Sequence, residues 1–165
     1  MNIKNYFRTL LGMFFVCAFF SAHSQTADNF NGSKADRDSL INTGNAIRAA
    51  FLKGDVNKIL LYHHPEVIKA LNYNSIQKGI MAVRSGLKGT LDSFTLAFTE
   101  NKIESLLINN ETAVEQTLFT IKGTPKAGGT PFIFEGRSMI VYVRYKGSPT
   151  GWASIREMIQ PYSDK

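Results

Sequence analysis

The chain has 165 residues but only one cysteine, three histidines and one tryptophan. Cys17 lies in an apolar stretch near the N-terminus, so the chain beyond it can form no disulfide bond and offers no thiolate nucleophile. Transition-metal sites are built mainly from Cys, His and carboxylate ligands. Beyond residue 24 the only histidines are His63 and His64. We therefore expect no metal site.

Clustered positive charge is also missing. The chain carries 19 basic and 13 acidic residues, but the basic residues are scattered, which argues against nucleic-acid binding. Residues 123–130 are similar to a phosphate-binding loop, yet Gly129 stands where that loop needs its lysine. A Gly-x-Ser-x-Gly motif for a nucleophilic serine is absent from the sequence. We expect no cofactor.

The most apolar stretch is too short to span a membrane. Thr9–Phe20 is about a dozen residues long, whereas a membrane-spanning helix needs roughly 20. Lys4 and Arg8 precede this stretch, and small residues precede Gln25, as in a secretory signal peptide. We predict that residues 1–24 are cleaved, leaving a secreted or periplasmic protein without a stable membrane anchor. The alternative is an uncleaved N-terminal anchor.

The remainder is long enough for one domain. Removing Lys4 and Arg8 leaves 17 basic and 13 acidic residues, a net charge of about +4. About 140 residues can bury roughly two-thirds of their unfolded surface in a single core. We expect a flexible lead-in over 25–35, one domain over 36–161 and a short tail over 162–165.

The first half of this domain has the periodicity of helices. From Asp36 to Lys53, apolar residues recur every three or four positions. Gly54 and Asp55 are typical of a helix end followed by a helix start, and Pro65 prevents the second helix from continuing. The pattern predicts helices over 36–53, 56–63 and 79–87, a short strand over 66–71 and a polar loop over 73–78.

The second half has the alternation of strands. Asn109, Asn110 and Glu111 indicate a turn, and the Gly-rich residues 123–130 indicate a hairpin loop. Helices followed by an antiparallel meander define an α+β domain without internal repeats. The predicted strands cover 94–108, interrupted near Asn101 and Lys102, then 112–122, 132–145 and 151–160.

The order of these features resembles the nuclear transport factor 2-like superfamily, in particular its SnoaL-like branch. The resemblance covers roughly residues 36–160. It implies a cone, similar to the cystatin fold, in which helices pack on a strongly curved antiparallel sheet and enclose a pocket. It rests on the following stretches of sequence: Phe51-Leu52-Lys53-Gly54-Asp55, Leu60-Leu61-Tyr62-His63-His64, Glu66–Leu71, Lys78-Gly79, and Gly151-Trp152 with Ile155.

The resemblance also directs attention to the residues after the second helix. The family places an acid/base carboxylate there, where this chain has His63, His64 and Glu66 in place of the usual Asp. His64 and Glu66 are therefore the candidate catalytic residues, since a neutral histidine suits proton transfer near pH 7. The alternative is that the histidines end a helix and that Glu66 is solvated. Tyr62 and Tyr73 fit either a ligand pocket or a plain core.

Two strand arginines are candidates for holding an acidic ligand. Alternation places Arg137 on one face with Glu135; that face is either the concave wall of the pocket or, as we favour, the convex surface. Of the adjacent Arg156 and Glu157 one must point inward, and we expect Arg156 to face the pocket or a dimer partner. Trp152 fits the core or an interface better than a ligand contact.

Proteins of the family that this chain resembles have many functions, so the fold alone does not decide the function. They include cyclases, ketosteroid isomerases, dehydratases and epoxide hydrolases, and also binding or dimerisation modules. The absent Asp favours a pocket protein that binds a small apolar or amphipathic molecule and forms a homodimer through its sheet. The alternatives are a cofactor-free acid–base isomerase, cyclase or dehydratase, and a dimeric protein-interaction module.

Overall fold

The computed structural model describes residues 30–162. The predicted signal peptide, residues 25–29 of the lead-in and residues 163–165 of the tail lie outside this range. Within it, no helix is both long and apolar enough to cross a membrane. The elements are α1 (Lys34–Lys53), α2 (Val56–Leu60), β1 (His63–Asn72), β2 (Ser75–Lys78), α3 (Ile80–Ser93), β3 (Phe94–Asn109), β4 (Thr112–Pro125), β5 (Phe132–Arg144) and β6 (Trp152–Pro161).

The strands form one six-stranded sheet in the order β2-β1-β6-β5-β4-β3. The four long strands β3 to β6 form the predicted antiparallel meander. β1 extends the sheet by pairing in parallel with β6, and β2 folds back antiparallel on β1. The α+β class is confirmed, and the parallel pair makes the sheet mixed.

Several expected boundaries were wrong: the third helix runs to Ser93 instead of ending at residue 87, and the strand expected over 66–71 begins at His63. The stretch expected as a polar loop contains β2, because Asn74 N donates to Asn72 Oδ1 at 2.9 Å and closes a tight turn, after which Ile76 pairs with Ala70. The second helix ends at Leu60 rather than His63. The chain leaves it there because Ser154 N donates to Tyr62 O at 2.9 Å, which joins the chain to β6.

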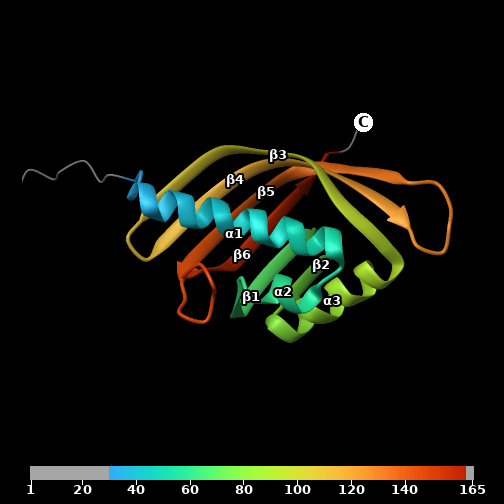
Figure 1. Ribbon diagram of the computed structural model, residues 1–165, viewed down its shortest axis with the longest axis horizontal. Helices are drawn as coiled ribbons and strands as arrows, with labels where there is room; N and C mark the ends of the chain where they lie inside the picture. The colour runs from blue at the N-terminus through green and yellow to red at the C-terminus, as the bar shows by residue number, and fades with distance from the viewer. Residues whose placement is uncertain (1–29, 163–165) are drawn as a thin grey trace, which may run out of the picture.

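Helix α1 ends at Lys53 as its sequence predicts and begins two residues before the expected Asp36. Ser33 Oγ accepts a hydrogen bond from Asp36 N at 3.1 Å and caps the first turn. Gly54 terminates the helix with a φ of 65°, a left-handed conformation that favours glycine. Figure 1 shows α1 lying across the sheet, with α2 and α3 beside the β1–β2 end. Register shifts in β3, between Phe98 and Glu100 and again further along, contribute to the curvature of the sheet.

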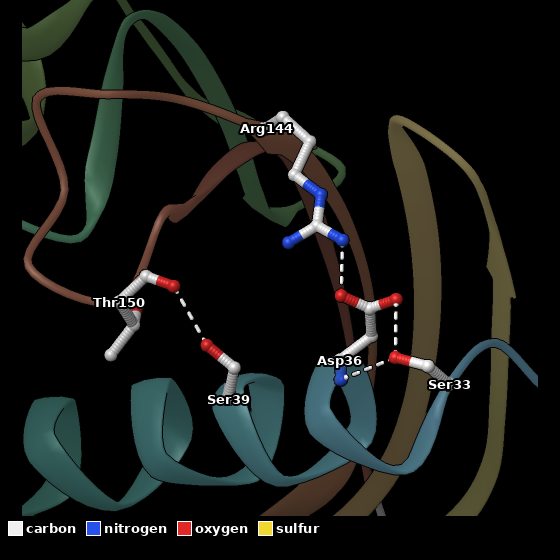
Figure 2. Close-up of polar contacts among 5 residues, drawn as sticks. All are labelled: Ser33, Asp36, Ser39, Arg144 and Thr150. Carbon is white, nitrogen blue, oxygen red and sulfur yellow. Dashed lines mark hydrogen bonds and ion pairs between the residues drawn. The ribbon is translucent and has the colours of Figure 1, made fainter.

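A set of polar contacts fastens the N-terminal half of α1 to the sheet (Figure 2). Asp36 forms an ion pair with Arg144 at the end of β5. Ser39 Oγ donates to the backbone oxygen of Thr150 at 2.7 Å. Under this half of the helix lies a core cluster of Leu40, Leu106, Ile108, Ala113, Tyr142 and Trp152. The expectation of a core tryptophan is confirmed, because Trp152 is fully buried.

Candidate functional site

A cavity of about 390 Å³ lies between the concave face of the sheet, the C-terminal half of α1 and α3. Its size is within the usual range of small-molecule sites. Helix α1 contributes Gly44, Ile47, Arg48 and Phe51, and α3 contributes Gly86, Leu87 and Thr90. Every strand of the sheet supplies further lining residues. The cavity is therefore the pocket that this arrangement of helices on a curved sheet encloses.

The sheet wall of the cavity changes from polar to apolar along the strands. Four successive rows of facing residues run across β4, β5 and β6 from the closed end toward the opening. They are Tyr142 with Ser154; Glu115 with Ile140 and Glu157; Thr117 with Ser138 and Ile159; and Phe119 with Gly136 and Pro161. Beyond them, Ile121 with Phe134 and Gly123 with Phe132 complete an apolar end. A bound molecule would therefore meet different chemistry at its two ends.

The first polar feature is a lysine–glutamate ion pair across β1 and β6. Lys69 faces Glu157 in register, and their charged atoms are 2.5 Å apart. Both side chains are largely buried, with exposed fractions of 10% and 13%. Burial alone would raise the pKa of the Glu157 carboxyl, but the Lys69 ammonium outweighs it and the pKa is lowered. Glu157 is therefore held as a carboxylate.

His63 is the second polar feature and is neutral. Its Nδ1 lies 2.9 Å from the carbonyl oxygen of Ile59. A carbonyl only accepts, so Nδ1 carries the proton and the lone pair is on Nε2. Burial and the nearby Lys69 ammonium lower the pKa of His63 to about 3. Next to it in register, the hydroxyl of Ser154 is buried without a hydrogen-bond partner among residues 30–162.

Glu115 is the third polar feature, on β4. It is 3% exposed, and its Oε1 accepts a hydrogen bond from Thr117 Oγ1 at 2.9 Å. Burial raises the pKa of this carboxyl, against the lowering effects of the Thr117 hydrogen bond and of the Arg48 charge. Tyr142, fully buried beside it, is also kept neutral because burial raises its pKa. This part of the wall thus holds a carboxyl group whose pKa is raised beside a neutral tyrosine hydroxyl.

The apolar end is lined by aromatic rings that contact one another edge-on or tilted. Phe51 and Phe98 have ring centroids 5.7 Å apart, Phe98 and Phe119 are 6.4 Å apart, and Phe119 and Phe134 are 5.7 Å apart. Phe132, at the end of the series, is 40% exposed. The aromatic end therefore lies at the opening of the cavity and the polar residues lie deeper.

The residues expected from the sequence lie elsewhere. None of His64, Glu66, Tyr62, Tyr73 and Arg137 is among the cavity-lining residues. The His64 ring packs edge-on against Tyr145 at 5.0 Å, and Glu66 is exposed. Tyr62 is buried and Tyr73 is 97% exposed.

The strand arginines point away from the cavity. Arg137 forms an ion pair with Glu104 at 2.7 Å, and its neighbour Ser138 lines the cavity, so Arg137 is on the convex face. Of the adjacent pair on β6, Glu157 lines the cavity and Arg156 is exposed. The inward residue is thus the opposite of the one expected, because Glu157 pairs with Lys69.

The lining residues that sequence reasoning missed are His63, Lys69, Glu115, Glu157 and Arg48. Alternation places Glu115 and Thr117 on one face of β4, which was a usable signal. Which face is concave, however, depends on pairing across strands. Within the described residues no group of three or more His, Cys, Asp or Glu could hold a metal ion.

Comparison with known proteins identifies the fold. No protein-family model matches the chain, and no curated protein matches it. Among solved structures, a conserved protein from Planctomyces limnophilus has a TM-score of 0.71 at 17% identity over 79% of this chain and 100% of its own. A putative scytalone dehydratase from Novosphingobium aromaticivorans has a TM-score of 0.70 at 11% identity over 78% and 85%.

A third similar structure is described as a member of the superfamily that gives this fold its name. It is a nuclear transport factor 2-like superfamily protein from Salmonella enterica, with a TM-score of 0.66 at 14% identity over 78% of this chain and 92% of its own. At these identities the likeness is one of fold. The chain has the nuclear transport factor 2-like, cystatin-related fold that its sequence resembles.

Proposed function

Starting from a nuclear transport factor 2-like fold, we propose that this protein binds a small amphipathic organic molecule in its cavity. The observation that carries the proposal is the gradient along the cavity wall, from the deep residues Lys69, Glu157 and Glu115 to the phenylalanines at the opening. An apolar tail would lie against the aromatic rings, and a polar head would reach the buried charged and hydroxyl groups.

An unsatisfied hydroxyl and a histidine acceptor at the deep end support this assignment. The Ser154 hydroxyl is buried without a partner among the described residues, and His63 Nε2 is an acceptor because Nδ1 donates to Ile59. Leaving buried polar atoms unpaired costs about 1–3 kcal/mol each. A ligand head group or bound water would recover part of this cost, so the site is built to receive a polar group.

Chain-length dependence tests the proposal. The fluorescent probe N-phenyl-1-naphthylamine reports occupancy of an apolar cavity, and n-alkyl amides of increasing length would displace it. Burying one methylene contributes about 0.8 kcal/mol, so each added methylene should tighten binding about fourfold until the cavity is full. Absence of probe binding, or displacement independent of chain length, would refute the proposal.

Two neighbouring positions on β6 provide a matched control. Ile159 lines the cavity, whereas the adjacent Met158 is 65% exposed. Ile159→Trp fills the cavity and should weaken amide binding strongly, and Met158→Trp should leave it unchanged. Circular dichroism and melting temperature establish that both variants are folded. Equal effects of the two substitutions would place the binding site elsewhere.

A second function, acid–base catalysis without a cofactor, is favoured by one observation. Glu115, with a raised pKa, and the neutral His63 line the same cavity. A carboxyl group whose pKa is raised can act as the general base, and the neutral imidazole can accept a hydrogen bond from the substrate. Deuterium exchange at the α-carbon of 2-nonanone, followed by NMR, tests this: the wild type should accelerate exchange and Glu115→Gln should not. No acceleration by the wild type would leave binding without turnover.

Export and dimerisation complete the proposal. The sequence of residues 1–24 supports secretion or transfer to the periplasm; the mature protein recovered from the host should begin at Gln25, and retention of Met1 would contradict cleavage. The exposed Met139 and Met158 pair across the convex side of β5 and β6 and support a homodimer through the sheet. Sedimentation should give a dimer that Met139→Glu dissociates, and a monomeric wild type would contradict it.

A further inference from the structure

Among residues 30–162, Arg48 is the one arginine that lines the cavity, and its position is set by the geometry of α1. Side chains of a helix point toward its N-terminus, so a residue covers the turn before it. Gly44 stands one turn earlier, and a Cβ there would lie only 3.0 Å from Arg48 Nη1. The absence of a side chain at position 44 therefore lets the guanidinium lie along the helix and enter the cavity.

The guanidinium has unused hydrogen-bonding capacity. Of its five N–H groups, Nη2 donates to Asn45 Oδ1 at 2.7 Å. No carboxylate among residues 30–162 lies within ion-pair distance of it. Burial lowers the pKa of Arg48, and the nearby Glu115 offsets this in part; arginine nevertheless keeps its charge at all physiological pH values.

The other charges of the cavity compensate it only in part. Lys69 and Glu157 neutralise each other as an ion pair, and His63 is neutral. Of the acidic lining residues in the described part of the chain, Glu115 remains, and its Oε1 accepts a hydrogen bond from Thr117 Oγ1. The interior of the cavity therefore has an arginine fork that lacks a bidentate carboxylate partner within the described chain.

We infer that the ligand of this cavity is an organic acid, whose carboxylate pairs with Arg48 while its apolar part lies against the aromatic opening. This deepens the proposed function and rests on it. Arginine and carboxylate match in shape as well as charge, because two parallel N–H···O bonds form. A second, shallow pocket that Arg48 also lines contains Glu100 beside Asn45 and Asn101, so we place the carboxylate on the side of Arg48 that faces the main cavity.

The test compares two competitors that differ in charge. Decanoate and decanamide share one alkyl length, and both displace N-phenyl-1-naphthylamine from the full mature protein. Decanoate should bind more tightly at neutral pH. A charge-assisted bond of this kind corresponds to about tenfold in affinity, so Arg48→Gln should weaken decanoate about tenfold and leave decanamide within about twofold.

Two variants of neighbouring residues and one further variant of Arg48 distinguish the guanidinium from general effects of charge. Gly44→Ala keeps the charge but places a methyl group against Arg48 Nη1, and should weaken decanoate more than decanamide. Glu115→Gln removes the competing carboxylate and should strengthen decanoate. Both variants and Arg48→Gln are checked for unchanged melting temperature, and Arg48→Lys should recover only part of the wild-type preference, because lysine lacks the fork.

The outcomes separate this inference from the proposed function. Preference for decanoate that disappears in Arg48→Gln supports the inference. Equal binding of both competitors to the wild type, or equal weakening of both by Arg48→Gln, overturns it and leaves the ligand cavity standing. Failure of both competitors to displace the probe overturns the cavity proposal and the inference together, and failure of decanoate alone overturns only the inference.

Discussion

Replacing Lys69 by methionine should destabilise the protein through the partner it leaves behind. Glu157 would remain in the wall of the cavity, 13% exposed, without the ammonium that lies 2.5 Å from it. Removing one partner of a buried ion pair costs about 3–5 kcal/mol. Because water can enter the cavity beside the pair, we expect the lower end, about 3 kcal/mol in the free energy of unfolding.

Removing both charges should be much less costly. A buried pair replaced by apolar residues of similar volume is often neutral or stabilising, so Lys69→Met with Glu157→Leu should recover most of the stability that Lys69→Met loses. Urea denaturation followed by circular dichroism measures all three proteins, and equal slopes against urea show that their unfolded states are comparable. If Lys69→Met costs under about 1 kcal/mol, or if the double variant is less stable than the single one, the pair does not act as described.

The contribution of Glu157 to the free energy of unfolding should change with pH in opposite directions in the wild type and in Lys69→Met. In the wild type the pKa of Glu157 is lowered by Lys69, so the pair contributes stability above the unfolded pKa and loses it as pH falls through the folded value. Without Lys69, burial dominates and raises the pKa of Glu157. Lys69→Met should then gain stability as pH falls toward the acid range. The difference in the free energy of unfolding between the wild type and Lys69→Met should therefore become smaller. A constant difference would contradict this account.

Further predictions concern the core and the ligand. Trp152→Ala should cost about 3–5 kcal/mol, because the ring is fully buried and packs under the Arg144 guanidinium at 3.9 Å; an unchanged melting temperature would contradict its place in the core. Decanoate affinity should rise as pH falls through the raised pKa of Glu115, since a protonated carboxyl no longer repels the ligand anion. Arg48, Tyr142 and Glu157 also act on Glu115, so Glu115→Gln is the control, and a pH dependence that survives it would assign the effect to another group.

The fold could be predicted from the sequence because its signals are local. Helical spacing from Asp36 to Lys53, the Gly54–Asp55 step and the alternation after Gly89 each depend on residues close in the chain. β2 was missed because it is four residues long and is formed by pairing with β1. The end of the second helix was misplaced for the same reason, since it is set by pairing with β6.

The candidate site could not be predicted as well, because it depends on which face of each strand becomes concave. Alternation correctly places Arg137 and Ser138 on opposite faces of the sheet, and likewise Arg156 and Glu157. It does not tell which of the two faces lines the cavity. A shift of one position exchanges every inward residue for its neighbour. His64 and Glu66 were chosen for their place after the second helix, and the inward position of that segment belongs to His63, whose Nδ1 is held by Ile59.

Two long-range strand pairings decide which residues of each strand point into the cavity. Parallel pairing of β1 with β6 brings Lys69 opposite Glu157, and each is too costly to bury without the other. Antiparallel pairing of β4 with β5 sets Thr117 opposite Ser138, and both line the cavity. The residues that could bind a ligand are therefore also residues that fix which face of each strand points into the cavity. For this reason, the effect of a substitution such as Lys69→Met on folding must be measured before any effect on binding is interpreted.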